Sequence, residues 1–196
     1  MIKSRLNSIM LKKNYVISIV ITLNLFYFFV ELFYAHTSHS VALIADSLDF
    51  LEDALTNFFA LIGLSLTILY RKIIGYAILT SFIAPSLYAL TFSVNKIFHP
   101  EVPDHHDMIL ISLGAIIINC LCTILLKRYT KSRNFLLRAI YLSSRNDLIG
   151  NLLVLLAAFL TLKSESFLPD FLVGVIILGI NIYAVYEIKT MMNQRR

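Results

Sequence analysis

The chain has 196 residues, of which 58% are hydrophobic and only 15% are charged, and its net charge is +5. This composition is typical of membrane proteins and argues against a soluble domain with a polar surface. The positive charge is distributed as expected for membrane orientation, which argues against nucleic acid as a partner. The two cysteines, Cys120 and Cys122, point to different sides of one apolar helix, so we predict neither a disulfide nor a metal pair.

Six apolar spans follow one another, and each is close to the length that crosses a bilayer as an α-helix. They are expected at residues 15–35, 41–67, 72–97, 108–127, 136–162 and 169–190. The sequence therefore predicts an all-α integral membrane protein with six transmembrane helices at 15–190. We expect a basic cytoplasmic N-terminus at 1–14 and a short cytoplasmic tail at 191–196. The first apolar run is too long for the core of a cleaved signal peptide, so we interpret it as the first membrane helix.

Basic residues gather on one side of the predicted bundle. If the spans alternate across the membrane, all of the 17 Lys and Arg residues lie on the side of the N-terminus except Lys96, Arg145 and Lys163. Loops rich in Lys and Arg stay in the cytoplasm. We therefore expect both termini in the cytoplasm and the cytoplasmic (inner) membrane as the location.

The span at 15–35 carries Asn24 and Glu31, which are seven residues apart and so share a helix face. Glu31 lies near the outer end of the span, within expected reach of interfacial water. Two interpretations stay open for it. It is either an acid that packs or snorkels near the membrane surface, or a group that lines an outer vestibule.

The span at 41–67 is the most unusual, because its first half contains four acids. A charged carboxylate near the middle of a membrane costs roughly 2.5–3.5 kcal/mol, so such acids are usually functional. At about 100° per residue, Asp46, Asp49 and Asp53 fall within roughly 60° of one another, whereas Glu52 lies about 100° from Asp53. Three carboxylates on one face repel each other, so this face requires a cation or shared protons.

The span at 136–162 carries a second polar stripe, formed by Ser143, Asp147 and Asn151 at intervals of four residues. Asn146 lies on another side of this helix.

Arg145 lies off the same stripe, and a guanidinium near the acids would repel a cation. We expect it to pair with Glu52 or Asp46 and so to fix the two acidic spans against each other. The alternative is a snorkelling Arg near the cytoplasmic end.

The other spans have fewer polar groups. We interpret 72–97 and 108–127 as scaffold. The span at 169–190 begins with Pro169 and Asp170, and we expect Asp170 to act as an acid at the N-terminus of that helix.

If the two acidic spans face each other in the bundle, their polar side chains form a candidate metal site. Asp49 and Asp53 would then oppose Asp147, and a neutral oxygen is available from Ser143, Asn146 and Asn151. Such oxygen ligands favour Mg²⁺, Mn²⁺ and Fe²⁺, with Zn²⁺ and Co²⁺ as further candidates. The same carboxylates suit proton exchange, which gives metal/proton antiport a physical basis. The alternative is a network of partly protonated acids that holds the bundle together.

Two motifs resemble signatures of the cation diffusion facilitators. HTSHSVALIADSLDFLEDALTN is similar to the second-helix signature, and SSRNDLIGN is similar to the fifth-helix signature. The resemblance implies that Asp49, Asp53 and Asp147 occupy metal-ligand positions and that Asp46 is the Asp preceding them in the family pattern. Ser143 stands where the family has His or Asp. The candidates for the fourth ligand are therefore Ser143, Asn146 and water.

The motifs DSLDFLED, SRNDLIGN and LPD resemble those of a short, membrane-only subgroup described as cobalt/zinc/cadmium transporters. The resemblance implies a cation-efflux-type bundle without the soluble C-terminal domain of the family, so a homodimer would form through membrane helices. It implies efflux of zinc, cobalt or cadmium. The oxygen ligands keep manganese and iron as further candidates, and we expect exchange for protons by alternating access. We expect no permanently bound cofactor, and the expected partners are the metal ion, protons and membrane lipid.

Three other functions stay open. The first is a cation-conducting channel or a proton-conducting membrane module. The second is a metal-dependent membrane enzyme, which the sequence disfavours because all five His residues lie outside the acidic faces. The third is an assembly partner without transport activity.

Overall fold

The computed structural model describes residues 2–64, 73–74, 76–77, 80, 83–132 and 135–193. Within these residues the chain forms six α-helices and no strand, which confirms the predicted all-α fold. The helices are α1 (Ile2–Thr37), α2 (Val41–Leu64), α4 (Ile83–Phe98), α5 (His105–Leu126), α6 (Phe135–Ser164) and α7 (Leu168–Asn193). A short 3-10 helix, η1 (Lys127–Tyr129), follows α5.

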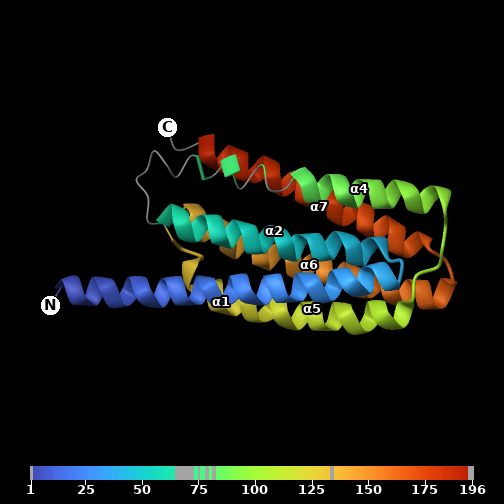
Figure 1. Cartoon of the computed structure of the whole chain (residues 1–196), viewed down its shortest axis with the longest axis horizontal. Coiled ribbons are helices and arrows are strands. Elements are labelled where there is room, and N and C mark those ends of the chain that lie inside the picture. The colour runs from blue at the N-terminus through green and yellow to red at the C-terminus, as the bar shows by residue number, and fades with distance from the viewer. Residues whose placement is uncertain are drawn as a thin grey trace.

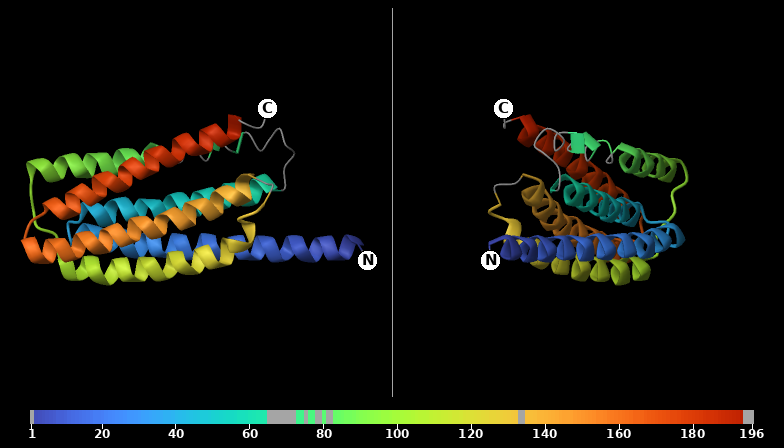
Figure 2. Two further views of the ribbon diagram at one scale, coloured as in Figure 1. Left: turned by 180° about the vertical axis from the view of Figure 1, so that it is seen from behind. Right: turned by 60° about the vertical axis from the view of Figure 1, so that its left-hand side comes forward.

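The helices run roughly along one axis in three layers (Figures 1 and 2). α1 and α5 form one outer layer, α4 and α7 form the other, and α2 and α6 lie between them. The start of α1 and the end of α7 lie at the same end of the bundle, where α1 extends past the other helices (Figure 1). The chain therefore begins and ends on one side, as expected, and the cytoplasmic assignment of that side stays a prediction.

Three segments of the described helices are long and apolar enough to cross a membrane. They are Lys13–Thr37, His105–Tyr129 and Ile140–Ser164, with mean hydropathies of 2.2, 2.6 and 1.6. α2 has 24 residues, about 36 Å of helix, but its acids lower its hydropathy. Two predicted spans continue into residues 65–72 and 81–82, and the expected tail includes 194–196, all of which lie outside the described residues.

The helix boundaries differ from the expected ones mainly at the N-terminus. α1 begins at Ile2, so most of the predicted basic segment at 1–14 continues the first membrane helix. The outward-facing side of this helix carries large apolar side chains. Phe26, Phe29 and Phe33 are each more than 60% exposed, which suits contact with lipid.

α2 is the helix around which the bundle packs, because it contacts α1, α4, α6 and α7. Every residue from 41 to 50 is buried. Close approach of α7 at the start of α2 depends on Gly174, where an added Cβ would lie 2.6 Å from Val41 Cγ1. The acids of α2 are therefore held inside the protein and away from lipid.

Candidate metal centre

The acidic faces of α2 and α6 meet in the middle layer of the bundle. Ser143 Oγ donates a hydrogen bond of 2.5 Å to Asp53 Oδ1, and Ser144 Oγ donates one of 3.0 Å to Asp53 Oδ2. The carboxyl group of Asp147 lies within hydrogen-bonding reach of Asp53. The structure thus brings together Asp53, Asp147 and Ser143, which the sequence placed on two facing stripes.

α7 adds a polar residue that the sequence did not single out. The side-chain amide of Asn181 donates a hydrogen bond to Asp49 Oδ1. Asn181 interrupts a stretch of α7 that otherwise lacks charged and amide side chains between residues 171 and 186. A lone amide in such a stretch is the signal that would have identified it.

A cavity of about 30 Å³ lies among α2, α6 and α7. This volume is enough for one or two water molecules or for a single ion. Its polar lining consists of Asp49, Glu52, Ser143, Asn146, Asp147 and Asn181, and Gly150, Ile177 and Ile180 complete the wall. Glu52, which helical spacing placed off the acidic stripe, therefore also faces this cavity.

The carboxylates lie close together without yet surrounding a common point. Among the described residues, no three Asp, Glu, His or Cys side chains converge as they do around a bound metal ion. Asp53 does not line the cavity, since both of its oxygens accept hydrogen bonds from Ser143 and Ser144. Ion binding at this place would require Asp53 to shift toward the cavity, and its carboxylate oxygens have further lone pairs with which to bind an ion while the serines donate.

Comparison with known families places the chain. A family model described as the cation efflux transmembrane domain matches residues 17–189, which include every residue named in this site. The chain belongs to the cation efflux family. Cation efflux proteins transport metal cations, so the chain is a cation transporter of the cation diffusion facilitator kind. In a search of curated proteins, no sequence matched the chain.

Ser143 is the main departure of this cation efflux protein from the signatures of the family. The side chain at this position is a hydroxyl, which donates to Asp53 and also lines the cavity. The residue that holds Asp53 in the described arrangement is therefore also a candidate to replace the usual His or Asp ligand.

Arg145 does not form the ion pair that we expected. Its side chain is exposed, and Nη2 donates a hydrogen bond of 3.1 Å to Asn146 Oδ1. Neither oxygen of Asp46 accepts a hydrogen bond from the described residues. The prediction that Arg145 pairs with Glu52 or Asp46 is therefore wrong, because Arg145 points out of the bundle.

Apart from Arg145, the supporting residues of the predicted site are buried, namely Asn24, Glu31, Asp46, Glu52 and Asn151. Asn24 Oδ1 accepts a weak hydrogen bond of 3.9 Å from Cys122 Sγ, and the side chain of Asn151 has no hydrogen-bond partner in the described part of the chain. Glu31 is fully buried, which agrees with the interpretation as a packing acid and not with snorkelling or a solvent-filled vestibule. Glu31 instead faces Asp46 across the contact between α1 and α2.

Asp170, in the first turn of α7, also caps the neighbouring helix α2. It accepts hydrogen bonds from Ser40 Oγ at 2.5 Å, from Val41 N at 2.8 Å and from Ala42 N at 3.0 Å. Free backbone N–H groups at a helix start are normally satisfied by such a cap. Asp170 lies in the first turn of α7, as expected for an acid at a helix start, and its hydrogen bonds in addition cap the start of α2.

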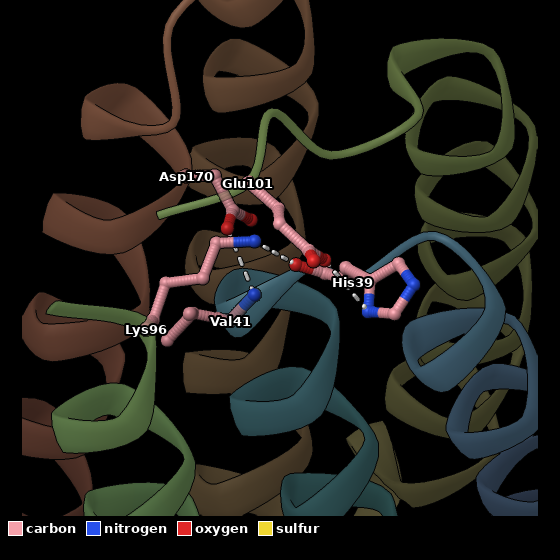
Figure 3. A network of polar contacts seen from close by, with 5 residues as sticks. All are labelled: His39, Val41, Lys96, Glu101 and Asp170. Carbon is pink, nitrogen blue, oxygen red and sulfur yellow. Dashed lines mark hydrogen bonds and ion pairs between the residues drawn. The ribbon is translucent and has the colours of Figure 1, made fainter. Parts of the chain in front are cut away.

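A second set of contacts holds the turn before α2 (Figure 3). Lys96 Nζ, from the end of α4, donates a hydrogen bond of 2.5 Å to the backbone oxygen of His39. His39 Nδ1 lies 3.3 Å from Glu101 Oε2. Figure 3 shows Lys96 next to Asp170, so α4 and α7 together fix the end of α2 from which the acidic stripe begins.

Proposed function

We propose that the chain exports a divalent metal cation in exchange for protons. The observation that carries this proposal is the meeting of carboxylates from α2 and α6 in a buried, water-sized cavity. Buried acids in a membrane bundle are costly, and ion pathways are the usual reason for them. Zinc, cobalt, cadmium, manganese and iron are the candidate ions.

Asp49, Asp53 and Asp147 bind the ion in this proposal, and Ser143, Asn146 or water supplies a fourth oxygen. Three carboxylates carry more negative charge than a divalent ion neutralises, so the ion is held strongly in a low-dielectric interior. An all-oxygen set lacks the imidazole that favours zinc, so it selects less sharply among these metals than a set with His.

When no metal is bound, protons bind to the carboxylates of the site instead. The clustered carboxylates cannot all stay ionised in the bundle interior without a cation, so protons bind as the metal leaves. Metal and protons therefore compete for the same negative charge. Alternating exposure of the site to the two sides of the membrane turns this competition into antiport.

Metal uptake into proteoliposomes tests the proposal. With an acidic lumen, antiport drives metal inward as protons leave, and we expect saturable uptake that disappears when the pH gradient is collapsed. Asp53→Asn and Asp147→Asn keep the shape of the side chain and remove its charge, so both should abolish uptake. Asp107→Asn is the matched control, because Asp107 lies in the first turn of α5, away from the site.

Two outcomes would count against the proposal. Uptake by both site variants at the rate of the wild type would show that the site is misassigned. Uptake that neither saturates nor depends on the pH gradient would instead favour the cation-conducting channel.

A further inference from the structure

Two buried acids lie outside the proposed metal ligands, and we call them the acid pair. They are Glu31 on α1 and Asp46 on α2, and both side chains are 0% exposed. None of their four carboxyl oxygens receives a hydrogen bond from the described residues. Their carboxyl groups lie within hydrogen-bonding reach of each other.

An ionised carboxylate that is buried without a donor is strongly unfavourable, and two adjacent ones also repel each other. One proton removes both problems, because the protonated acid donates a hydrogen bond to its ionised neighbour. Paired carboxyl groups in enzymes share a single proton for this reason. The acid pair therefore has a hydrogen bond between its two carboxyl groups when it holds one proton, and none when both groups are ionised.

The surroundings of the acid pair offer no other source of positive charge. The ionisable groups that influence it are Tyr27, Asp49 and Asp147, and none of them is cationic. The hydroxyl of Tyr27 is already used, since it donates a hydrogen bond of 2.5 Å to Ile111 O on α5.

A metal ion does not fit the acid pair as well as a proton does. A divalent ion needs several oxygen ligands around it at about 2.0–2.6 Å. The two carboxyl groups face each other across the contact between α1 and α2, and neither Glu31 nor Asp46 lines the cavity of the metal centre. The ligand with the right size and charge is H⁺.

Asp46 is nevertheless close to the metal centre. It lies one helical turn from Asp49, about 4.5 Å along the axis of α2. An added Cβ at Gly150 of α6 would lie 3.6 Å from Asp46 Oδ1 and 3.9 Å from Asp49 Oδ2. A positive charge bound by Asp49 therefore acts on the acid pair through a short stretch of protein interior.

We propose that Glu31 and Asp46 form a proton-binding site, separate from the metal ligands, which releases its proton when the metal binds. This inference rests on the proposed metal/proton exchange. The bound ion stabilises the doubly ionised pair, so the proton leaves to solvent and the charge of the pair changes from −1 to −2. Coupling between two sites is reciprocal, so a proton on the pair weakens metal binding to the same extent.

Isothermal titration calorimetry of the purified full chain with Zn²⁺ tests the inference. Titrations in buffers of different ionisation enthalpy count the protons released for each Zn²⁺ bound. We expect Glu31→Gln to bind Zn²⁺ with the stoichiometry of the wild type and to release about one proton fewer, because the amide mimics the protonated acid. Glu165→Gln, an exposed change in the turn before α7, should release as many protons as the wild type.

A second variant guards against a folding defect in the first. Asp46→Asn should also release about one proton fewer, and Glu31→Gln combined with Asp46→Asn should lose no more, since the pair shares a single proton. Infrared spectroscopy should show a band from a protonated carboxyl group in the metal-free wild type that is weaker in either variant.

The outcomes separate this inference from the proposed function. Proton release that is unchanged in both variants, with Zn²⁺ binding intact, would overturn the proton site and leave the metal site standing. A lower Zn²⁺ stoichiometry in Glu31→Gln would also overturn it, because the pair would then be a metal site. Full Zn²⁺ binding by Asp53→Asn would instead overturn the proposed function.

Discussion

The metal centre and the acid pair both bury carboxylates along α2, but they differ in their hydrogen-bond donors. In the metal centre, Ser143 and Ser144 donate to Asp53, and Asn181 donates to Asp49. In the acid pair, no donor reaches either Glu31 or Asp46 from the described residues. Donors stabilise the ionised carboxylate, whereas their absence favours the protonated one. The difference suits a cation in the first region and a proton in the second.

The largest expected effect is on metal affinity, which should fall far more when the metal centre is changed than when the acid pair is changed. Asp147→Asn should weaken Zn²⁺ binding by more than about 100-fold, because it removes a charged ligand and not merely the support of one. Glu31→Gln should change the affinity by less than about tenfold, since its coupling to the metal is indirect. Calorimetric titration measures both. Equal losses of affinity in the two variants would show that the acid pair and the metal centre do not have separate roles in metal binding.

The next effect concerns a donor in the metal centre. Asn181→Leu removes the hydrogen bond to Asp49 while keeping a side chain of similar size, and it should weaken metal binding about 10- to 100-fold. Asn193→Leu, near the end of the same helix, serves as the matched control. Affinity that is unaffected by Asn181→Leu would mean that Asp49 needs no support from α7.

A change of ligand type should alter selectivity more than affinity. Ser143→His introduces an imidazole at the position where the family signature has His or Asp. We expect the preference for Zn²⁺ over Mn²⁺ to rise by about tenfold, because imidazole nitrogen suits Zn²⁺ better than Mn²⁺. Competition between the two ions in the uptake assay measures it. An unchanged preference would show that residue 143 does not contact the ion.

Adding a donor to the acid pair should make it behave more like the metal centre. Gly150→Ser places a hydroxyl near Asp46, since the new Cβ lies at ordinary contact distance. A donor stabilises the ionised pair, so fewer protons should be released for each Zn²⁺ at neutral pH. Gly150→Ala controls for the added carbon. Identical proton counts in the two variants would refute this account of the pair.

The smallest effect is expected from Arg145. Arg145→Gln should change metal affinity and uptake by less than about twofold, because the side chain is exposed and bonds only to its neighbour Asn146. A large loss of uptake would instead indicate that Arg145 forms the ion pair with Glu52 or Asp46 that the sequence led us to expect.

Helical periodicity predicted the part of the site that lies on two helices. The stripes of Asp49 and Asp53 and of Ser143 and Asp147 were readable, because residues three or four positions apart share a helix face. Their meeting followed from the cost of leaving such acids in lipid.

Helical periodicity could not predict contacts that depend on how each helix is rotated and shifted along its axis relative to its neighbours. Nothing local shows that Glu31 meets Asp46 or that Asp170 caps α2, because each contact joins separate helices. Asn181 has no polar neighbour at helical spacing, and the direction of Arg145 is set by packing. Close approach at glycines, as at Gly174 against Val41, fixes these relations only in the folded bundle.

The hydrogen bonds between Asp170 and the start of α2 have a mechanical consequence. Hydrogen bonds to Asp170 anchor the first turn of α2 to α7, so a swing of α2 in the proposed transport cycle would pivot about that end. Asp49 lies about 12 Å and Asp53 about 18 Å from this pivot along the helix. Such a swing would displace Asp53 farther than Asp49 and would spread the proposed ligands unevenly, so that the ion would leave from one side first.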